Sequence, residues 1–135
     1  MTRGFRCNLV SRVSSGVKLN HLNLIVTDVP ATAAFLEKYF GLRTLAPGNV
    51  NMAFMSDEAG LVLIMFKGKD VSYPEGFHIG FIQESEAAVN EINQRLKDDG
   101  FDVPAPTRNQ GGRWTFYFDS PGGFVIEVEY VKFGT

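Results

Sequence analysis

The feature that most limits how this chain can fold is a repeat in the order of its predicted elements. Hydrophobic periodicity predicts a strand, a helix and three strands in the first half of the chain, and the same order in the second half. In the first half, strands are expected over 19–27, 43–45, 51–56 and 61–66, with a helix over 28–41. In the second half, strands are expected over 76–82, 101–103, 113–118 and 124–131, with a helix over 85–99. Each half has about 50 residues, which is too few to bury a comfortable core alone, so the two halves are expected to share one domain.

Matching positions support the repeat. His21 opens the first unit and His78 opens the second, 57 residues later. Gly60 and Gly123 each precede an apolar strand and lie 63 residues apart. The second unit therefore carries about six extra residues in its loops, and the two units are predicted to be modules of the same design.

The repeat also predicts the domain boundaries. A single domain is expected over 18–135, with its two modules at about 18–68 and 75–132. Residues 1–17 are interpreted as an N-terminal extension that packs on another surface, such as a partner subunit. The extension is rich in Arg and Ser and has no acidic residue, which is faintly typical of an organelle-targeting segment, but its composition favours a plain extension.

Composition places the chain among ordinary globular proteins. Of its 135 residues, 44% are hydrophobic and 21% are charged. Thirteen basic and fifteen acidic residues leave a net charge of -2, so neither nucleic acid nor an anionic membrane is an expected partner. No apolar run approaches the roughly 18 residues of a membrane span, and no secretory signal is present, so a cytoplasmic protein is predicted. The single cysteine, Cys7, excludes an internal disulfide and a Cys-based zinc site.

The only two histidines occupy equivalent positions of the repeat. Because strand side chains alternate, His21 and His78 are expected on the strand faces opposite the apolar, helix-covered core. Glu127 is expected on the corresponding face of the last strand. Two imidazoles and a carboxylate on neighbouring strands form an open ligand set for one divalent metal ion, such as Zn, Fe, Mn, Ni or Co, with positions left for water and substrate.

Each of these residues also has a plainer interpretation. A strand histidine is often only hydrogen-bonded or half-exposed, and Glu127 and Glu129 could face solvent. The shared register of the two histidines favours the metal. The first-module position that matches Glu127 is Ile64, so three protein ligands are the most this set can supply.

The pattern resembles the vicinal oxygen chelate superfamily, which includes glyoxalase I, extradiol dioxygenases, and fosfomycin-resistance and bleomycin-resistance proteins. Three stretches carry the resemblance: LNHLNLIVTDVPATAAFLEKYFGL over 19–42, GFHIGF over 76–81, and FYFDSPGGFVIEVE over 116–129. The first and last are fairly specific to the superfamily, and neither identifies a subfamily.

The resemblance implies an α+β fold of two tandem βαβββ modules that form a cupped mixed sheet, the glyoxalase-like fold. It also implies a metal site at His21, His78 and Glu127, and a homodimer in which the site can lie between subunits. Ile64 stands where glyoxalase I has an additional Glu, which argues against a true glyoxalase I. Gly122 stands where the superfamily's turn usually has an acidic residue.

Further site residues are expected on the same faces. Thr115 and Tyr117 match hydroxyl-bearing positions near the substrate in the thiol-transferase branch, and Tyr117 is a candidate proton donor. Glu129 is the second candidate for moving protons. The expected substrate contacts are completed by Asn23, which shares the His21 face, by Arg113 beside a Gly-rich loop, and by Trp114 as a pocket wall. Plainer roles remain open: a tyrosine lining a half-buried sheet, and an arginine in solvent.

Two functions of different classes follow. The first is a metal-dependent enzyme that acts on a small substrate with two adjacent oxygens, as a lyase or isomerase, a thiol transferase or an extradiol-type dioxygenase. The second is a metal-free, bleomycin-resistance type of protein that binds a small molecule or drug. The absence of a dense Lys/Arg cluster weakens fosfomycin as a substrate. Two histidines and a glutamate at ligand positions favour the enzyme.

Overall fold

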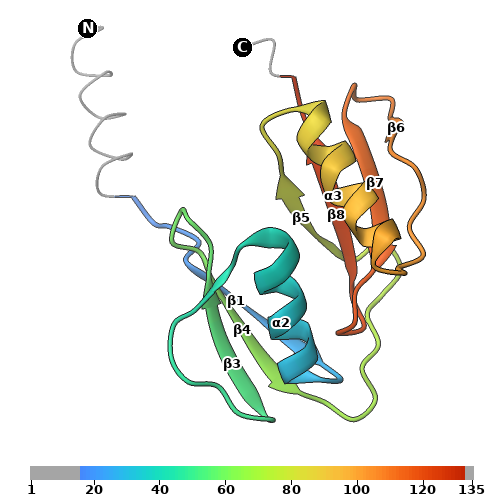
Figure 1. The fold of residues 1–135 in the computed structure, drawn as a ribbon. Helices are drawn as coiled ribbons and strands as arrows, with labels where there is room; N and C mark the ends of the chain where they lie inside the picture. Colours follow the sequence, from blue (N-terminus) through green and yellow to red (C-terminus); the bar gives the residue numbers. More distant parts are fainter. Residues whose placement is uncertain (1–15, 133–135) are drawn as a thin grey trace, which may run out of the picture.

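The computed structural model describes residues 16–132, which form two modules of the same design (Figure 1). The first module contains β1 (His21–Val26), α2 (Val29–Phe40), β2 (Arg43–Thr44), β3 (Met52–Ser56) and β4 (Val62–Lys67). The second contains β5 (His78–Ile82), α3 (Glu86–Asp98), β6 (Thr107–Arg108), β7 (Trp114–Asp119) and β8 (Val125–Tyr130). The mixed four-stranded sheets have the orders β1-β4-β3-β2 and β5-β8-β7-β6. The predicted α+β fold with two βαβββ modules is confirmed.

The two sheets also share their register. His21 lies opposite Val62 in the parallel pair of β1 and β4, as His78 lies opposite Val125 in the pair of β5 and β8. Two residues further along each pair, Ile64 and Glu127 occupy the same position. The equivalence predicted from the turn glycines is therefore confirmed.

Capping residues mark where both helices begin and where α2 ends. The Asp28 side chain accepts a hydrogen bond from the Ala31 amide at the start of α2, and Ser85 does the same for Ala88 at the start of α3. Gly41 follows α2 with a φ of 68°, a left-handed conformation that favours glycine.

The strand predicted over 101–103 is wrong. The outer strand of the second sheet is the short β6, four residues further along the chain. Val103 is buried in the core, and prolines follow at 104 and 106, so this segment packs under α3 as a loop without a ladder of hydrogen bonds. Its apolar residues serve packing, which periodicity alone does not separate from a strand.

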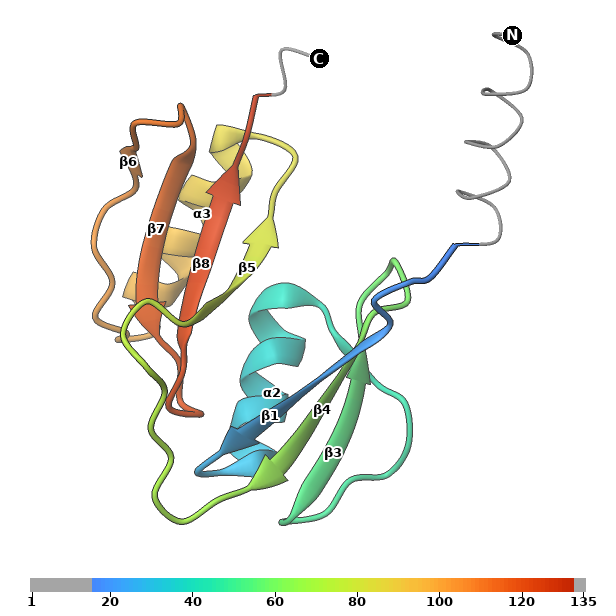
Figure 2. The same ribbon diagram turned by 180° about the vertical axis from the view of Figure 1, so that it is seen from behind.

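The modules join through their helix sides. Both helices lie on the same side of the molecule in Figure 1, and Figure 2 shows the opposite side, where the two sheets are not covered by helices. Phe35 of α2 packs its ring against Phe101 and Phe118 of the second module, with centroids 5.3 and 5.9 Å apart. Tyr39 also hydrogen-bonds to Asp99 at the end of α3. One hydrophobic core therefore runs through both modules.

The two sheets remain separate within the chain. In residues 16–132 no strand of one sheet pairs with a strand of the other, and β1 and β5 each stand at a sheet edge. In the linker between the modules, the Tyr73 hydroxyl accepts from the Ile25 amide at 2.9 Å and donates to the Ile25 carbonyl at 2.7 Å. Tyr73 therefore satisfies the edge of β1 at Ile25, four residues after His21.

The turn before β8 lies against the first module, which explains one departure from the superfamily's pattern. A Cβ at Gly122 would lie 2.8 Å from a Phe124 ring carbon and 2.9 Å from the Thr32 hydroxyl of α2. Replacing Gly122 by alanine should lower the free energy of unfolding by about 1–3 kcal/mol, because these buried neighbours must shift. Urea denaturation measures the loss. Gly111→Ala is the matched control: its nearest neighbour would be 3.4 Å away, and an unchanged midpoint in both variants would contradict the prediction.

Two further expectations concern a membrane-spanning helix and the N-terminal extension. In the part of the chain that the structure describes, no helix is long and apolar enough to cross a membrane. The predicted N-terminal extension over 1–17 lies almost wholly outside the described residues.

Candidate metal site

The centre of the candidate site is a pair of side chains on the open face of the second sheet. Nε2 of His78, at the start of β5, lies 3.3 Å from Oε1 of Glu127 in the middle of β8. His78 is partly exposed, whereas Glu127 is buried at 5% exposure. Gly80 follows His78 on the same face of β5 and lies directly opposite Glu127, and its missing side chain leaves the space beside the carboxylate open.

Hydrogen bonding leaves one nitrogen of each histidine available. Nδ1 of His78 lies 2.9 Å from the Gly76 carbonyl, which can only accept, so Nδ1 carries the proton. Nε2 then presents either a lone pair or a second proton to the Glu127 carboxylate. Nδ1 of His21 is engaged in the same way by the Asn20 side-chain oxygen at 2.7 Å. An oxygen acceptor on Nδ1 is the arrangement that orients a histidine to bind a metal through Nε2.

The Glu127 carboxylate is oriented from its other side. The hydroxyl of the buried Thr115 donates to Oε2 of Glu127 at 2.7 Å, so Oε1 is the oxygen turned toward His78. Burial by itself would raise the pKa of Glu127, but hydrogen bonding from Thr115 and Tyr117 outweighs burial and holds the pKa below its usual value. The carboxylate is therefore ionised and held in one orientation, as a metal ligand requires.

Tyr117 and Glu129 lie beside this pair on the same face. Tyr117 lies opposite Glu127 in the antiparallel pair of β7 and β8, and its ring meets the His78 ring edge to face at 5.3 Å. Burial and the neighbouring Glu127 raise the pKa of Tyr117 to about 12. Burial and the charge of Glu127 also raise the pKa of Glu129. Tyr117 thus stays a hydrogen-bond donor at neutral pH, and Glu129 accepts a proton more readily than an ordinary glutamate.

The shifted phenol gives a direct test. The ultraviolet difference spectrum between wild type and Tyr117→Phe should show no tyrosinate below about pH 11, because an ordinary phenol ionises near 10 and this one is raised. A spectrophotometric pH titration measures it. A difference spectrum that develops around pH 10 would show that the phenol is not held by Glu127.

The first module places its predicted residues elsewhere. His21 and Asn23 share the open face of β1, opposite Val62 and Ile64. In residues 16–132 no three His, Cys, Asp or Glu side chains lie close enough together to hold a metal ion. The structure therefore brings together His78 and Glu127 and keeps His21 of the same chain apart from them.

The remaining predicted contacts divide between the two faces of the second sheet. Arg113 lies on the open face, with Nε 3.7 Å from Oε2 of Glu129. Trp114 points to the helix side, where its indole nitrogen donates to Asn90 of α3 at 2.8 Å. Arg108 covers the Trp114 ring, pairs with Glu86 at 2.7 Å and donates to the Gly112 carbonyl at 3.2 Å, so it stabilises the Gly-rich loop over 109–112.

Two contributors could not be predicted from residue types. The Gly76 carbonyl orients His78 from a turn in which Gly76 has a φ of 87°. A depression of about 380 Å³ beside the pair is lined by Gly76, Phe77, His78, Tyr117 and Val125. The Gly-Phe dipeptide before His78 is evident in the sequence. Nothing in it indicates that the Gly76 carbonyl oxygen orients the His78 ring.

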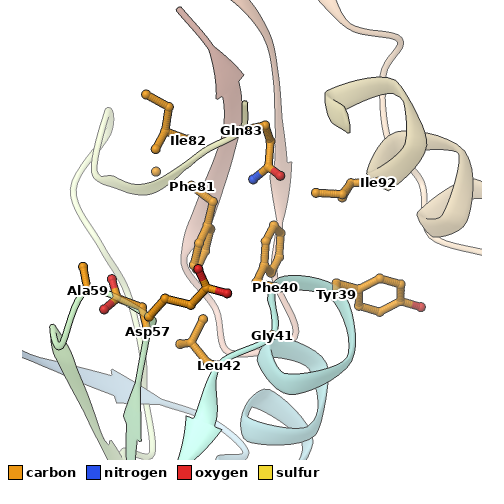
Figure 3. Close-up of a pocket in the computed structure, with 12 residues that line it drawn as sticks. Tyr39, Phe40, Gly41, Leu42, Asp57, Ala59, Phe81, Ile82, Gln83 and Ile92 are labelled. Atoms are coloured by element: carbon orange, nitrogen blue, oxygen red, sulfur yellow. The ribbon is translucent and has the colours of Figure 1, made fainter. Parts of the chain in front are cut away.

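A larger cavity lies at the junction of the modules. It has about 410 Å³ and is lined by the end of α2, the β3–β4 turn and β5 (Figure 3). Phe40 stacks on Phe81 there, with ring centroids 4.0 Å apart. The Asp57 side chain accepts a hydrogen bond from the Leu61 amide at 2.8 Å. None of the predicted site residues lines this cavity. We therefore interpret it as part of the junction and not as the candidate site.

Paired βαβββ modules with a histidine and a glutamate on the open face of one sheet define a glyoxalase-like protein. The chain belongs to the Glyoxalase/Bleomycin resistance protein/Dioxygenase superfamily, whose family model matches residues 18–128. The predicted membership of the vicinal oxygen chelate superfamily is confirmed.

Individual relatives agree with this family. A possible glyoxalase from Bacillus cereus is 50% identical, with a TM-score of 0.79 over 84% of this chain and 98% of that chain. The fosfomycin resistance protein FosX of Listeria innocua is 29% identical over 75% of this chain and 80% of its own length. A variant of FosX from Listeria monocytogenes, solved with Mn(II) and 1S,2S-dihydroxypropylphosphonic acid, is 25% identical, with a TM-score of 0.70 over 86% of this chain and 93% of that chain. The superfamily thus includes proteins that bind a divalent metal and a small molecule.

Proposed function

We propose that this protein is a divalent-metal-dependent enzyme of the vicinal oxygen chelate type, acting on a small substrate with two adjacent oxygen atoms. One observation carries the proposal: Nε2 of His78 and Oε1 of Glu127 face each other at 3.3 Å while their other polar atoms are occupied by Gly76 and Thr115. A cation between them satisfies both groups. Two imidazole nitrogens and one carboxylate suit a first-row divalent metal.

The third ligand, His21, is proposed to come from a second copy of the chain. Within one chain the modules meet through α2 and leave His21 away from the His78 and Glu127 pair. In residues 16–132 the outer edges of β1 and β5 are unpaired except at Ile25. In a twofold dimer, β1 of each copy would lie beside β5 of the other. Each dimer would then hold two sites, each with His21 of the partner subunit.

The remaining residues have proposed roles in the reaction. A divalent metal held there supplies a Lewis acid that stabilises negative charge on a substrate oxygen. Tyr117 stays protonated and would turn its one proton from Glu127 to that oxygen when substrate binds, and Glu129 would take up or return a proton. Thr115 positions Glu127, and Arg113 is held by Glu129. Asn23, beside His21, is proposed to contact the substrate.

Metal titration tests the proposal. Isothermal titration with Mn(II) should give one metal per chain, because each dimer has two sites. Thr115→Val should bind Mn(II) about 10–100-fold more weakly, as loss of a group that orients a ligand usually does. Thr107→Val is the matched control, since Thr107 lies opposite Thr115 on β6 and is exposed. A wild-type protein that takes up no Mn(II), Zn(II) or Fe(II) would overturn the proposal.

A further inference from the structure

The open face of the first sheet is the structural counterpart of the site face, but its chemistry is different. The shared register pairs each site residue with a first-module position. Thr115, Tyr117, Glu127 and Glu129 correspond to Met52, Phe54, Ile64 and Phe66. These four hydroxyl and carboxylate groups are thus replaced by apolar side chains, whereas Asp119 at the end of β7 corresponds to the polar Ser56.

This apolar face is open to solvent. Phe66 and Ile25 are 37% and 43% exposed, and Met52, Phe54 and Ile64 are half-buried. On β1, β3 and β4 this face carries no Asp, Glu, Lys or Arg. A contiguous apolar surface of this kind marks a place where something binds.

The position of His21 indicates what binds there. His21 lies on the same face, directly opposite Val62, and Asn23 lies opposite Ile64. Neighbouring strands are about 4.8 Å apart, so a molecule bound at His21 meets this apolar surface immediately. The second sheet offers most of the charged and hydroxyl groups. On the first sheet the one hydroxyl on these strands, Ser56, is buried and donates to the Asp57 carbonyl, and the cation Arg43 lies opposite Ser56 on the outer strand β2.

Resting on the proposed function, we infer that the substrate is amphiphilic: its paired oxygens bind at the metal, and an uncharged hydrocarbon part lies on the apolar face formed by Ile25, Phe54, Ile64 and Phe66. A phosphonate or polycarboxylate does not suit this wall. The open face of β7 and β8, together with the residue just before β7, carries one Lys or Arg, which is Arg113. Its charge is already paired with Glu129, 3.7 Å away.

A series of hydroxamates tests the inference, because each presents the same two oxygens with a tail of chosen length. Affinities for the Mn(II)-loaded protein are measured by competition from acetohydroxamate to octanohydroxamate, which differ by six methylenes. A fully buried methylene gives about fourfold in affinity and a half-buried one about twofold, so about 60-fold is expected across the series. Phosphonoacetate should bind more weakly than octanohydroxamate.

Variants locate the tail. Phe66→Ser and Ile25→Ser should each reduce the gain from acetohydroxamate to octanohydroxamate several-fold. Leu22→Ser is the matched control: Leu22 is also 37% exposed, but it points to the opposite face of β1, so the gain should stay. Equal losses in Leu22→Ser and Phe66→Ser would overturn the inference.

The outcomes separate the two proposals. Failure to take up metal overturns the proposed function and this inference with it. Binding of Mn(II) and acetohydroxamate without any gain from a longer tail overturns this inference alone. The same holds if Phe66→Ser and Ile25→Ser both keep the full tail gain, because the tail would then lie elsewhere.

Discussion

Mixing His21→Ala chains with His78→Ala chains should restore metal binding that neither variant has alone. Each homodimer lacks one ligand at both of its sites, and removing a ligand should cost at least the 10–100-fold that loss of an orienting group costs. In the mixed dimer, one site loses both histidines, and the other pairs an intact His21 with an intact His78 and Glu127. Random exchange makes about half of the dimers mixed, so about a quarter of the wild-type sites should return.

The measurement is Mn(II) bound at a fixed free concentration after the two variants have been unfolded together and refolded. His78→Ala mixed with Glu127→Gln is the matched control. Both of these ligands belong to the same sheet, so no mixed dimer regains a complete site and no binding should return. Restoration in the control, or none in the His21 and His78 mixture, would contradict a site shared between copies.

The fold was predictable because the repeat is written in local patterns. Capping by Asp28 and Ser85, the glycine after α2 and the alternation along β1 and β8 each depend on neighbouring residues only. The loop over 101–103 was mistaken for a strand because its buried Val103 has the same apolar signature as a strand residue.

The register predicted the pairing of His78 with Glu127 on one face, and the structure shows them 3.3 Å apart. The position of His21 could not be predicted in the same way, because it depends on how the modules pack. That packing is set by contacts between distant residues, such as Phe35 with Phe101 and Tyr39 with Asp99. No local pattern in the sequence distinguishes such contacts from packing within one module.

Phe35 therefore determines more than the stability of its own helix. Its side chain is 5% exposed, and its ring contacts Tyr39 at 4.9 Å within α2 as well as Phe101 and Phe118 across the junction. Replacing Phe35 by alanine should lower the free energy of unfolding by about 3–5 kcal/mol, because the cavity removes contacts to both modules. That is a large part of the 5–15 kcal/mol that stabilises a typical domain.

Two readouts distinguish loosening of the junction from a general loss of stability. Urea denaturation gives the free energy, and limited proteolysis reports cleavage in the linker over 68–77 under native conditions. In Phe35→Ala the linker should be cut faster, because Tyr73 holds it against Ile25 of β1 and against Phe124 of the second module only while the modules stay packed. Phe66→Ala is the matched control: the same side chain is removed from the open face of β4, where 37% exposure limits the loss to about 1 kcal/mol. If both variants lost the same free energy and their linkers were cut at the same rate, α2 would not be what joins the modules, and His21 would be free to reach His78 within one chain.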